Sequence, residues 1–437
     1  MTATLLETIQ TLQRQAASLL LYASVLETDA GQAFVSLLDA IALTLHSETK
    51  QPECDRTCLQ AYSRWFRCLA GQNASWQTVL LQATLQDENP FSLQAQQRRL
   101  ATLPASLVTA AQHDLQILQQ LHAITSQQLS HWVQQATQLP AAPVAWELEV
   151  TDSEDAAHTL GFSPSWPEAL PALVQHYRQQ GTGVFASYSA LRWHQGKLVG
   201  IPHPDPVQMA DLAGYADQQQ LLAQNTEALL AGYPALNVLL YGSRGSGKSS
   251  LIKAMRSRYC DRGLRLIEVA KSDLGDLSTI VEQLRGLPQC FIIFVDDLSF
   301  EDDDATYKAL KVVLEGTLTP RPPNVVVYAT SNRRHLIREF FGDRPRPRDQ
   351  DEIHAWDTVQ EKLSFCDRFG LTLTFEPADQ PTYLTIVRHL AEQAQIPLEP
   401  SELEARSLQW ATRHNGRSGR TARQFIDFLR AELQLPS

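Results

Sequence analysis

The sequence predicts an α/β fold class: a parallel sheet with flanking helices, a helical lid after it and an α-helical domain before it. Apolar runs and helical patterns alternate between residues 205 and 375, as in β-α units. Three helical patterns follow Pro377, and residues 4–138 carry apolar side chains at helical spacing. The expected segments are an α-helical N-terminal domain (1–140), a linker and small mixed α/β segment (141–204), an α/β core (205–376) and a helical lid (377–437).

The first 140 residues show the periodicity of packed helices. Apolar residues are spaced four and three positions apart at Leu5, Ile9 and Leu12, and region 114–136 shows the same helical spacing. Prolines punctuate the expected helix boundaries. The simplest interpretation is that these apolar stripes form the core of the domain itself.

The predicted sheet rests on five short apolar runs in the second half of the chain. Continuous runs, rather than alternating ones, are typical of parallel strands buried on both faces. The expected strands are Val238–Tyr241, Leu264–Val269, Phe291–Val295, Val325–Ala329 and Leu371–Phe375.

A phosphate-binding loop follows the first of these runs. Residues 242–249 read Gly-Ser-Arg-Gly-Ser-Gly-Lys-Ser, the P-loop spacing between a strand and a helix, so a chance glycine-rich turn is the weaker alternative. Glycines let successive N–H groups face a phosphate. Lys248 would contact the outer phosphates, and the Ser249 hydroxyl would ligate Mg²⁺. The candidate ATP-binding residues are Gly242, Ser243, Arg244, Gly245, Ser246, Gly247, Lys248, Ser249 and Ser250.

Two acids end the strand expected at 291–295. Asp296 would hold Mg²⁺ through water, and Asp297 stands where a carboxylate that polarises the attacking water is expected. The alternative is a solvated acidic loop, because residues 301–304 are also acidic.

Asn332 follows the strand expected at 325–329. If that strand lies between the two motif strands, the Asn332 amide can bond the attacking water and the γ-phosphate. The alternative role is to cap the next helix, which asparagine does well.

These three motifs together resemble an AAA+ ATPase. They are most similar to a widespread bacterial family of predicted AAA+ ATPases catalogued as a domain of unknown function. The similarity covers about residues 175–430, with several motifs in the right order. It implies an AAA+ type P-loop NTPase fold with ATP and Mg²⁺ as ligand and cofactor. Further matching stretches lie at 181–183, 190–193, 211–215, 225–226 and 361–370.

The resemblance implies an active site shared between subunits. Arg368, before the strand at 371–375, is similar to the arginine finger of bacterial replication initiators, which reaches the γ-phosphate of a neighbouring subunit. A homo-oligomer with Arg368 acting in trans is therefore expected. Arg333 and Arg334 are rivals for this role, and a surface salt bridge is the plain alternative.

The resemblance also implies nucleotide contacts from outside the P-loop. Arg420 and Arg423 both fit a sensor arginine that contacts phosphate in cis, and spacing does not choose between them. Gly214 and Tyr215 stand where AAA+ proteins wrap the adenine.

One departure from the family pattern leaves two functions open. Many AAA+ enzymes carry glutamate where this chain has Asp297, and aspartate is one methylene shorter. An oligomeric Mg²⁺-dependent ATPase that remodels or loads a macromolecular client is expected. The alternative is a slowly hydrolysing nucleotide-dependent switch or scaffold.

Bulk properties restrict partners and location. The net charge of −11 argues against strong sequence-independent attraction to nucleic acid, which stays an expectation by analogy with replication initiators alone. No apolar run approaches the roughly 18 residues of a membrane span. With six cysteines expected as free thiols, the chain is expected to be cytoplasmic.

Overall fold

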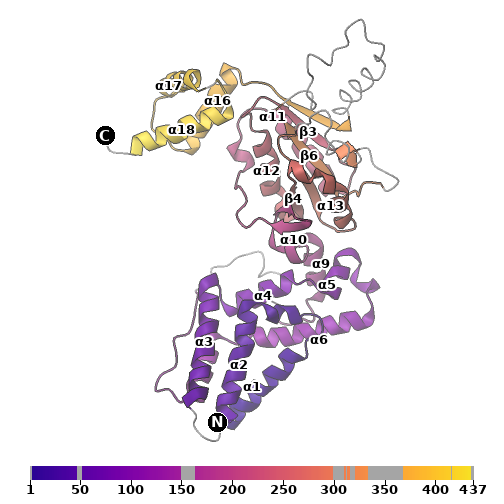
Figure 1. Cartoon of the computed structure of the whole chain (residues 1–437), viewed down its shortest axis with the longest axis vertical. Coiled ribbons are helices and arrows are strands. Elements are labelled where there is room, and N and C mark those ends of the chain that lie inside the picture. The colour runs from indigo at the N-terminus through magenta and orange to yellow at the C-terminus, as the bar shows by residue number, and fades with distance from the viewer. Residues whose placement is uncertain are drawn as a thin grey trace. The chain divides into compact units, whose positions relative to one another are not determined.

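A computed structural model describes residues 2–46, 52–148, 163–298, 310–311, 313–314, 320–332, 368–414 and 416–434. The chain forms two compact units, Met1–Ser187 and Tyr188–Ser437, whose elements are labelled in Figure 1.

The first unit is helical, which confirms the prediction for residues 4–138. Capping residues start several of its helices: Ser75, Asn89 and Thr125 each accept a hydrogen bond from the backbone of the first turn. The helices are α1 (Thr2–Ala17), α2 (Asp29–His46), α3 (Pro52–Gln72), α4 (Trp76–Gln86), α5 (Pro90–Gln97), α6 (Ala105–His122), α7 (Ser126–Thr137), α9 (Leu170–Gln180) and α10 (Gly183–Ser187), with 3-10 turns η1 (Ala23–Glu27) and η2 (Leu100–Thr102).

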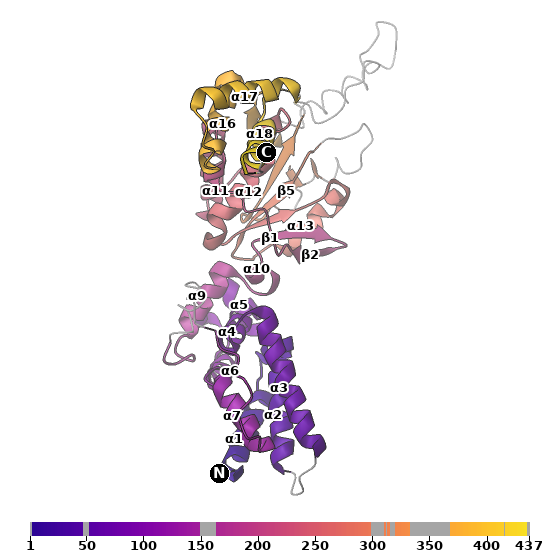
Figure 2. The same cartoon turned by 90° about the vertical axis from the view of Figure 1, so that its left-hand side faces the viewer.

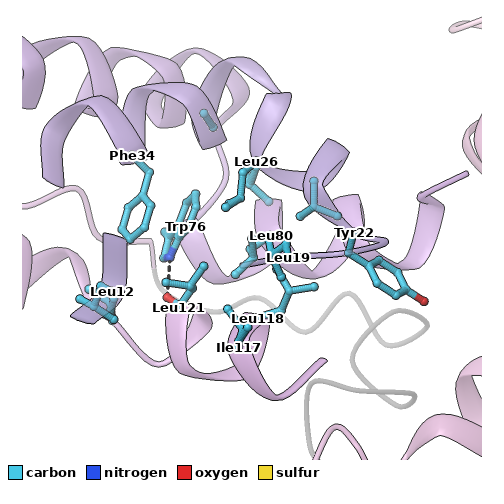
Figure 3. Packing of buried hydrophobic residues seen from close by; sticks show 14 of the residues in the cluster. Leu12, Leu19, Tyr22, Leu26, Phe34, Trp76, Leu80, Ile117, Leu118 and Leu121 are labelled. Carbon is cyan, nitrogen blue, oxygen red and sulfur yellow. Dashed lines mark hydrogen bonds between the residues drawn. The ribbon is translucent and has the colours of Figure 1, made fainter. Parts of the chain in front are cut away.

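The core of this unit is built from the apolar stripes. Phe34 and Trp76 stack with ring centroids 4.3 Å apart, and the Trp76 indole N–H donates to the Leu121 carbonyl at 2.9 Å (Figure 3). Ile9 and Leu12 belong to the same buried cluster. The stripes are therefore the core of the unit itself.

The second unit contains a seven-stranded sheet in the order β2-β1-β4-β5-β6-β3-β7. Every neighbouring pair is parallel except the β1–β2 hairpin. The five expected strands are confirmed, with small changes at their ends. The strands are β1 (Ala190–His194), β2 (Lys197–Gly200), β3 (Val238–Gly242), β4 (Leu264–Glu268), β5 (Cys290–Val295), β6 (Val325–Ser331) and β7 (Leu371–Phe375).

Strands β1 and β2 were not recognised in the sequence, and they extend the sheet upstream of residue 205. In β1, Leu191 and Trp193 are buried whereas Arg192 is exposed. Arg192 forms an ion pair at 2.7 Å with Glu268 of β4, its partner in the parallel register. The stretch at 190–193 is therefore accounted for as an added strand of the sheet.

Helices flank the sheet and form a lid beyond it. They are α11 (Ala216–Leu230), α12 (Lys248–Tyr259) and α13 (Leu277–Gln283), then α16 (Gln380–Gln393), α17 (Pro400–Arg413) and α18 (Gly419–Gln434) of the lid, with 3-10 turns η4 (Met209–Asp211), η5 (Cys260–Arg262) and η6 (Lys271–Asp276). Figure 2 shows the three lid helices grouped together, and they share a core that includes Tyr383, Val387 and Phe425. Within the described ranges, no helix has the length and apolar character needed to cross a membrane.

Candidate nucleotide-binding site

The phosphate loop joins β3 to α12. Gly242 has a φ of 142°, and a Cβ there would lie 1.9 Å from the Phe375 carbonyl oxygen of β7, so no larger residue fits. Gly247 adopts a left-handed conformation, with a φ of 90°, just before α12. The loop therefore lies against the first turn of a helix, which favours an anion.

The Lys248 side chain lies inside this loop. It is buried, and its Nζ donates to the carbonyl oxygens of Gly242 and Ser243 at 3.0 and 2.6 Å and to Asn332 Oδ1 at 3.3 Å. Burial lowers the pKa of Lys248, and the charges of two nearby aspartates partly oppose this. The loop thus encloses a buried ammonium group.

Two oxygen ligands suited to Mg²⁺ meet beside the loop. The Ser249 hydroxyl, in the first turn of α12, donates to Asp296 Oδ1 at 2.7 Å. A hydroxyl and a carboxylate are hard oxygen donors of the kind Mg²⁺ binds, so these residues fit the ion.

The strand order places Asn332 beside the acids. β6 lies between β5 and β3, which is the condition that the Asn332 hypothesis set, so the ends of all three strands meet at one edge. Asn332 Nδ2 donates to Asp297 Oδ1 at 2.6 Å, while its Oδ1 accepts from Lys248. Asp297 has a φ of 50°, in the left-handed region that non-glycine residues seldom adopt.

Thr330 is a site residue that sequence reasoning missed. Its hydroxyl donates to Asp296 Oδ1 and accepts from the Asp297 backbone N–H at 2.9 Å. The available signal was a hydroxyl directly after the apolar run at 325–329, two residues before Asn332.

A cavity of ≈ 740 Å³ opens over these groups. Its polar lining includes the phosphate loop, Asp296 and Asn332. Its apolar lining includes Phe375 with Ile386 and Leu390 of the lid. The lining residues also include Leu212, Ala213, Gly214, Tyr215, Gln219, Thr330, Asp297, Arg420, Arg423, Gln424 and Asp427.

Gly214 and Tyr215 also line this cavity. The Tyr215 ring is 5.0 Å from that of Phe375, and its hydroxyl donates to the Glu376 carbonyl at 2.6 Å. A Cβ on Gly214 would lie 3.3 Å from Thr382 of lid helix α16. This segment therefore contacts both the core and the lid.

The start of α18 packs directly on the phosphate loop. The Arg420 backbone N–H donates to the Gly245 carbonyl at 3.1 Å. Arg420 and Arg423 both line the cavity with exposed side chains, so the structure brings both sensor candidates to the site.

Arg368 lies elsewhere. It is half-buried, just before β7, and does not line the cavity. β7 and β3 run parallel, with Leu371 opposite Val238 and Phe375 opposite Gly242, so Arg368 is at the amino edge of the sheet. The rival residues Arg333 and Arg334 lie outside the described residues.

The phosphate loop after β3, the acids after β5, the intervening β6 and the helical lid define an α/β P-loop NTPase of the AAA+ type. The chain belongs to the family described as "Protein of unknown function (DUF815)", which matches residues 186–433.

Comparison with solved structures finds RuvB from Thermotoga maritima. One RuvB mutant is 18% identical with a TM-score of 0.37, over 52% of this chain and 66% of that chain. A second mutant is 15% identical with a TM-score of 0.33, over 51% and 72%. A structure titled as the RuvB Holliday junction branch migration motor is 14% identical with a TM-score of 0.32, over 51% and 72%. No curated protein matches the chain.

Proposed function

We propose that this protein is a Mg²⁺-dependent ATPase that works as an oligomer to remodel or load a macromolecular client. The observation that carries the proposal is the convergence of Lys248, Asp296, Asp297 and Asn332 on one cavity at the carboxyl edge of the sheet. Each side chain has a separate task in phosphoryl transfer to water.

Lys248 and the loop N–H groups would bind the β- and γ-phosphates. Ser249 and Asp296 would hold Mg²⁺, which when bound neutralises charge on the phosphate oxygens. Lys248 contacts Asn332 Oδ1 and two loop carbonyls, and a γ-phosphate would compete for this ammonium.

Asp297 and Asn332 would orient the attacking water. The Asp297 carboxylate accepts from the Asn332 amide at 2.6 Å, so the two groups share one location. A water bound there would meet an acceptor for its proton and a donor for its oxygen.

The base would lie against the apolar lining. Ile386 and Leu390 are buried lid residues, and the Tyr215 ring lies 5.0 Å from that of Phe375, tilted by 47°, on the core side. An adenine between them would join lid and core, while Arg420 or Arg423 would offset phosphate charge.

The position of Arg368 supports a finger acting in trans. Between Leu371 and Phe375 the strand rises about 13 Å, so Arg368 is separated from its own phosphate loop by the height of the sheet. At the amino edge, Arg368 is too far from a phosphate bound at the carboxyl edge of its own sheet. It would instead contact the phosphate of a nucleotide bound to a neighbouring subunit.

A second candidate is the slowly hydrolysing switch or scaffold. The direct contact between Asp297 and Asn332 favours it, because a short carboxylate held by an amide is less available to a water. In either case we propose a cytoplasmic protein with an unidentified client, and contact with nucleic acid rests on analogy.

Steady-state ATPase activity measured against protein concentration tests the proposal. Turnover per chain that rises cooperatively with concentration supports the oligomeric ATPase. Tight Mg²⁺–ATP binding without turnover supports the switch. Absence of nucleotide binding contradicts both. Capture of partners on an Asp297→Asn variant loaded with ATP would then identify the client.

A further inference from the structure

The Thr330 hydroxyl is hydrogen-bonded to both of the acids that follow β5, to the side chain of Asp296 and to the backbone N–H of Asp297. It is 2% exposed, and its strand pairs with β5 so that Ala329 lies opposite Val295. Thr330 is therefore level with Asp296. We propose that Thr330 is a positioning residue for hydrolysis, whose hydroxyl sets the orientation of the Asp296 carboxylate and the backbone of Asp297. This inference rests on the proposed ATPase function.

The direction of each hydrogen bond follows from the groups present. The Asp297 N–H is a donor, so the Thr330 oxygen accepts from it at 2.9 Å. The single hydroxyl proton then points to Asp296 Oδ1, an acceptor when ionised. The two hydrogen bonds therefore point in one direction, from the Asp297 N–H through the Thr330 hydroxyl to the Asp296 carboxylate, and each bond polarises the next.

These hydrogen bonds limit how the Asp296 carboxylate can rotate. Thr330 of β6 and Ser249 of α12 both donate to the same oxygen, Oδ1. The Asp297 backbone N–H also donates to Oδ1, at 3.2 Å, so Thr330 and Ser249 are its two side-chain donors, and they hold the carboxylate from different elements before a metal arrives. A ligand held in its binding orientation costs less to order when the ion binds.

The same hydroxyl supports the turn at Asp297. With a φ of 50°, this residue adopts a left-handed conformation that a side chain disfavours. The bond from its N–H to Thr330 helps to hold the turn. The turn directs the Asp297 carboxylate to Asn332, which donates to it at 2.6 Å.

A packing role for Thr330 makes a different prediction. Valine has nearly the same shape and suits a buried strand, so Thr330→Val removes the hydroxyl and keeps the packing. Thr330→Ser keeps the hydroxyl and removes a methyl group. Comparison of the two variants separates positioning from packing.

The experiment uses the full-length chain and a fluorescent ATP analogue. Binding is measured with EDTA and then along a Mg²⁺ titration, and ATP turnover is measured in parallel. For Thr330→Val we expect unchanged affinity in EDTA, about a tenfold higher Mg²⁺ concentration at half-saturation and at least about tenfold slower turnover. Thr330→Ser should stay within about threefold of wild type in both. Thermal unfolding checks that both variants are folded.

Two results overturn the proposal. One is a Thr330→Val variant whose Mg²⁺ dependence and turnover stay within about twofold of wild type, and the other is an equal loss in the valine and serine variants. If Thr330→Val does not fold, Thr330→Ala against Thr330→Ser repeats the contrast. A wild-type chain that binds no nucleotide overturns the proposed function itself, and this inference with it. If the wild type binds without turnover, the Mg²⁺ titration alone gives the answer.

Discussion

The two compact units use aspartate in opposite ways. In the helical unit, Asp114 is fully buried and accepts hydrogen bonds from the three consecutive backbone N–H groups of residues 20–22. In the P-loop unit, Tyr188–Ser437, Asp296 and Asp297 are exposed to a cavity. Their side chains contact other side chains at the ends of neighbouring elements. An acid satisfied by backbone supports the fold, whereas an acid presented to a cavity is available for a ligand.

The largest effect is expected at Arg368, whose substitution tests whether the proposed active site of the P-loop unit needs a residue from a second subunit. Arg368→Ala should bind ATP almost normally and lose about 1,000-fold in turnover, about 4 kcal/mol of transition-state stabilisation. Mixing it with Lys248→Ala should restore part of the turnover, because one mixed interface pairs an intact loop with an intact finger. No restoration at any ratio, in a preparation shown to contain mixed oligomers, would leave Arg368 as a structural arginine.

Substitution of Asp114 tests the structural side of the comparison. Asp114→Ala leaves three backbone N–H groups without their acceptor and should destabilise the helical unit by about 3 kcal/mol or more. Chemical denaturation followed by circular dichroism measures this. Asp39 of α2 is exposed and supplies the matched control, since Asp39→Ala should leave the unfolding midpoint almost unchanged. Equal behaviour of the two variants contradicts the role given to Asp114.

Substitutions of Asp296 and Asp297 test the proposed roles of the acids at the cavity, because the two adjacent acids are expected to have different tasks. Asp297→Asn should keep Mg²⁺–ATP binding and lower turnover by about 100-fold, since the water-orienting step alone needs that carboxylate. Asp296→Asn should weaken the Mg²⁺ dependence of binding. Binding is measured by nucleotide titration with and without Mg²⁺. Equal losses of binding in both variants are incompatible with this division.

Lys248 gives the smallest predicted change in free energy. Lys248→Ala removes the buried cation of the phosphate loop and should weaken ATP binding by roughly 1.5–3 kcal/mol. Lys253 lines the same cavity but pairs with Asp205 at 3.1 Å, so Lys253→Ala is the matched control and should retain binding. ATP affinity of Lys248→Ala within about twofold of wild type would refute the phosphate-loop assignment.

Local patterns in the sequence were sufficient to predict most elements and the centre of the candidate site. The helical spacing of Leu5, Ile9 and Leu12, the continuous apolar strands and the loop at 242–249 each depend on residues close together in the chain. Their periodicity reflects the geometry of a single helix or strand. The hypothesis for Asn332 required β6 to lie between β5 and β3, and the strand order meets that condition.

Only the tertiary structure decided the pairings between distant segments. β1 pairs with β4, with Leu191 opposite Ile267. The register of β5 and β6 brings Thr330 level with Asp296. The contact of Arg420 with Gly245 requires the lid to fold back on the phosphate loop. Such contacts depend on strand register and on packing between elements far apart in sequence, and no local spacing records either of them.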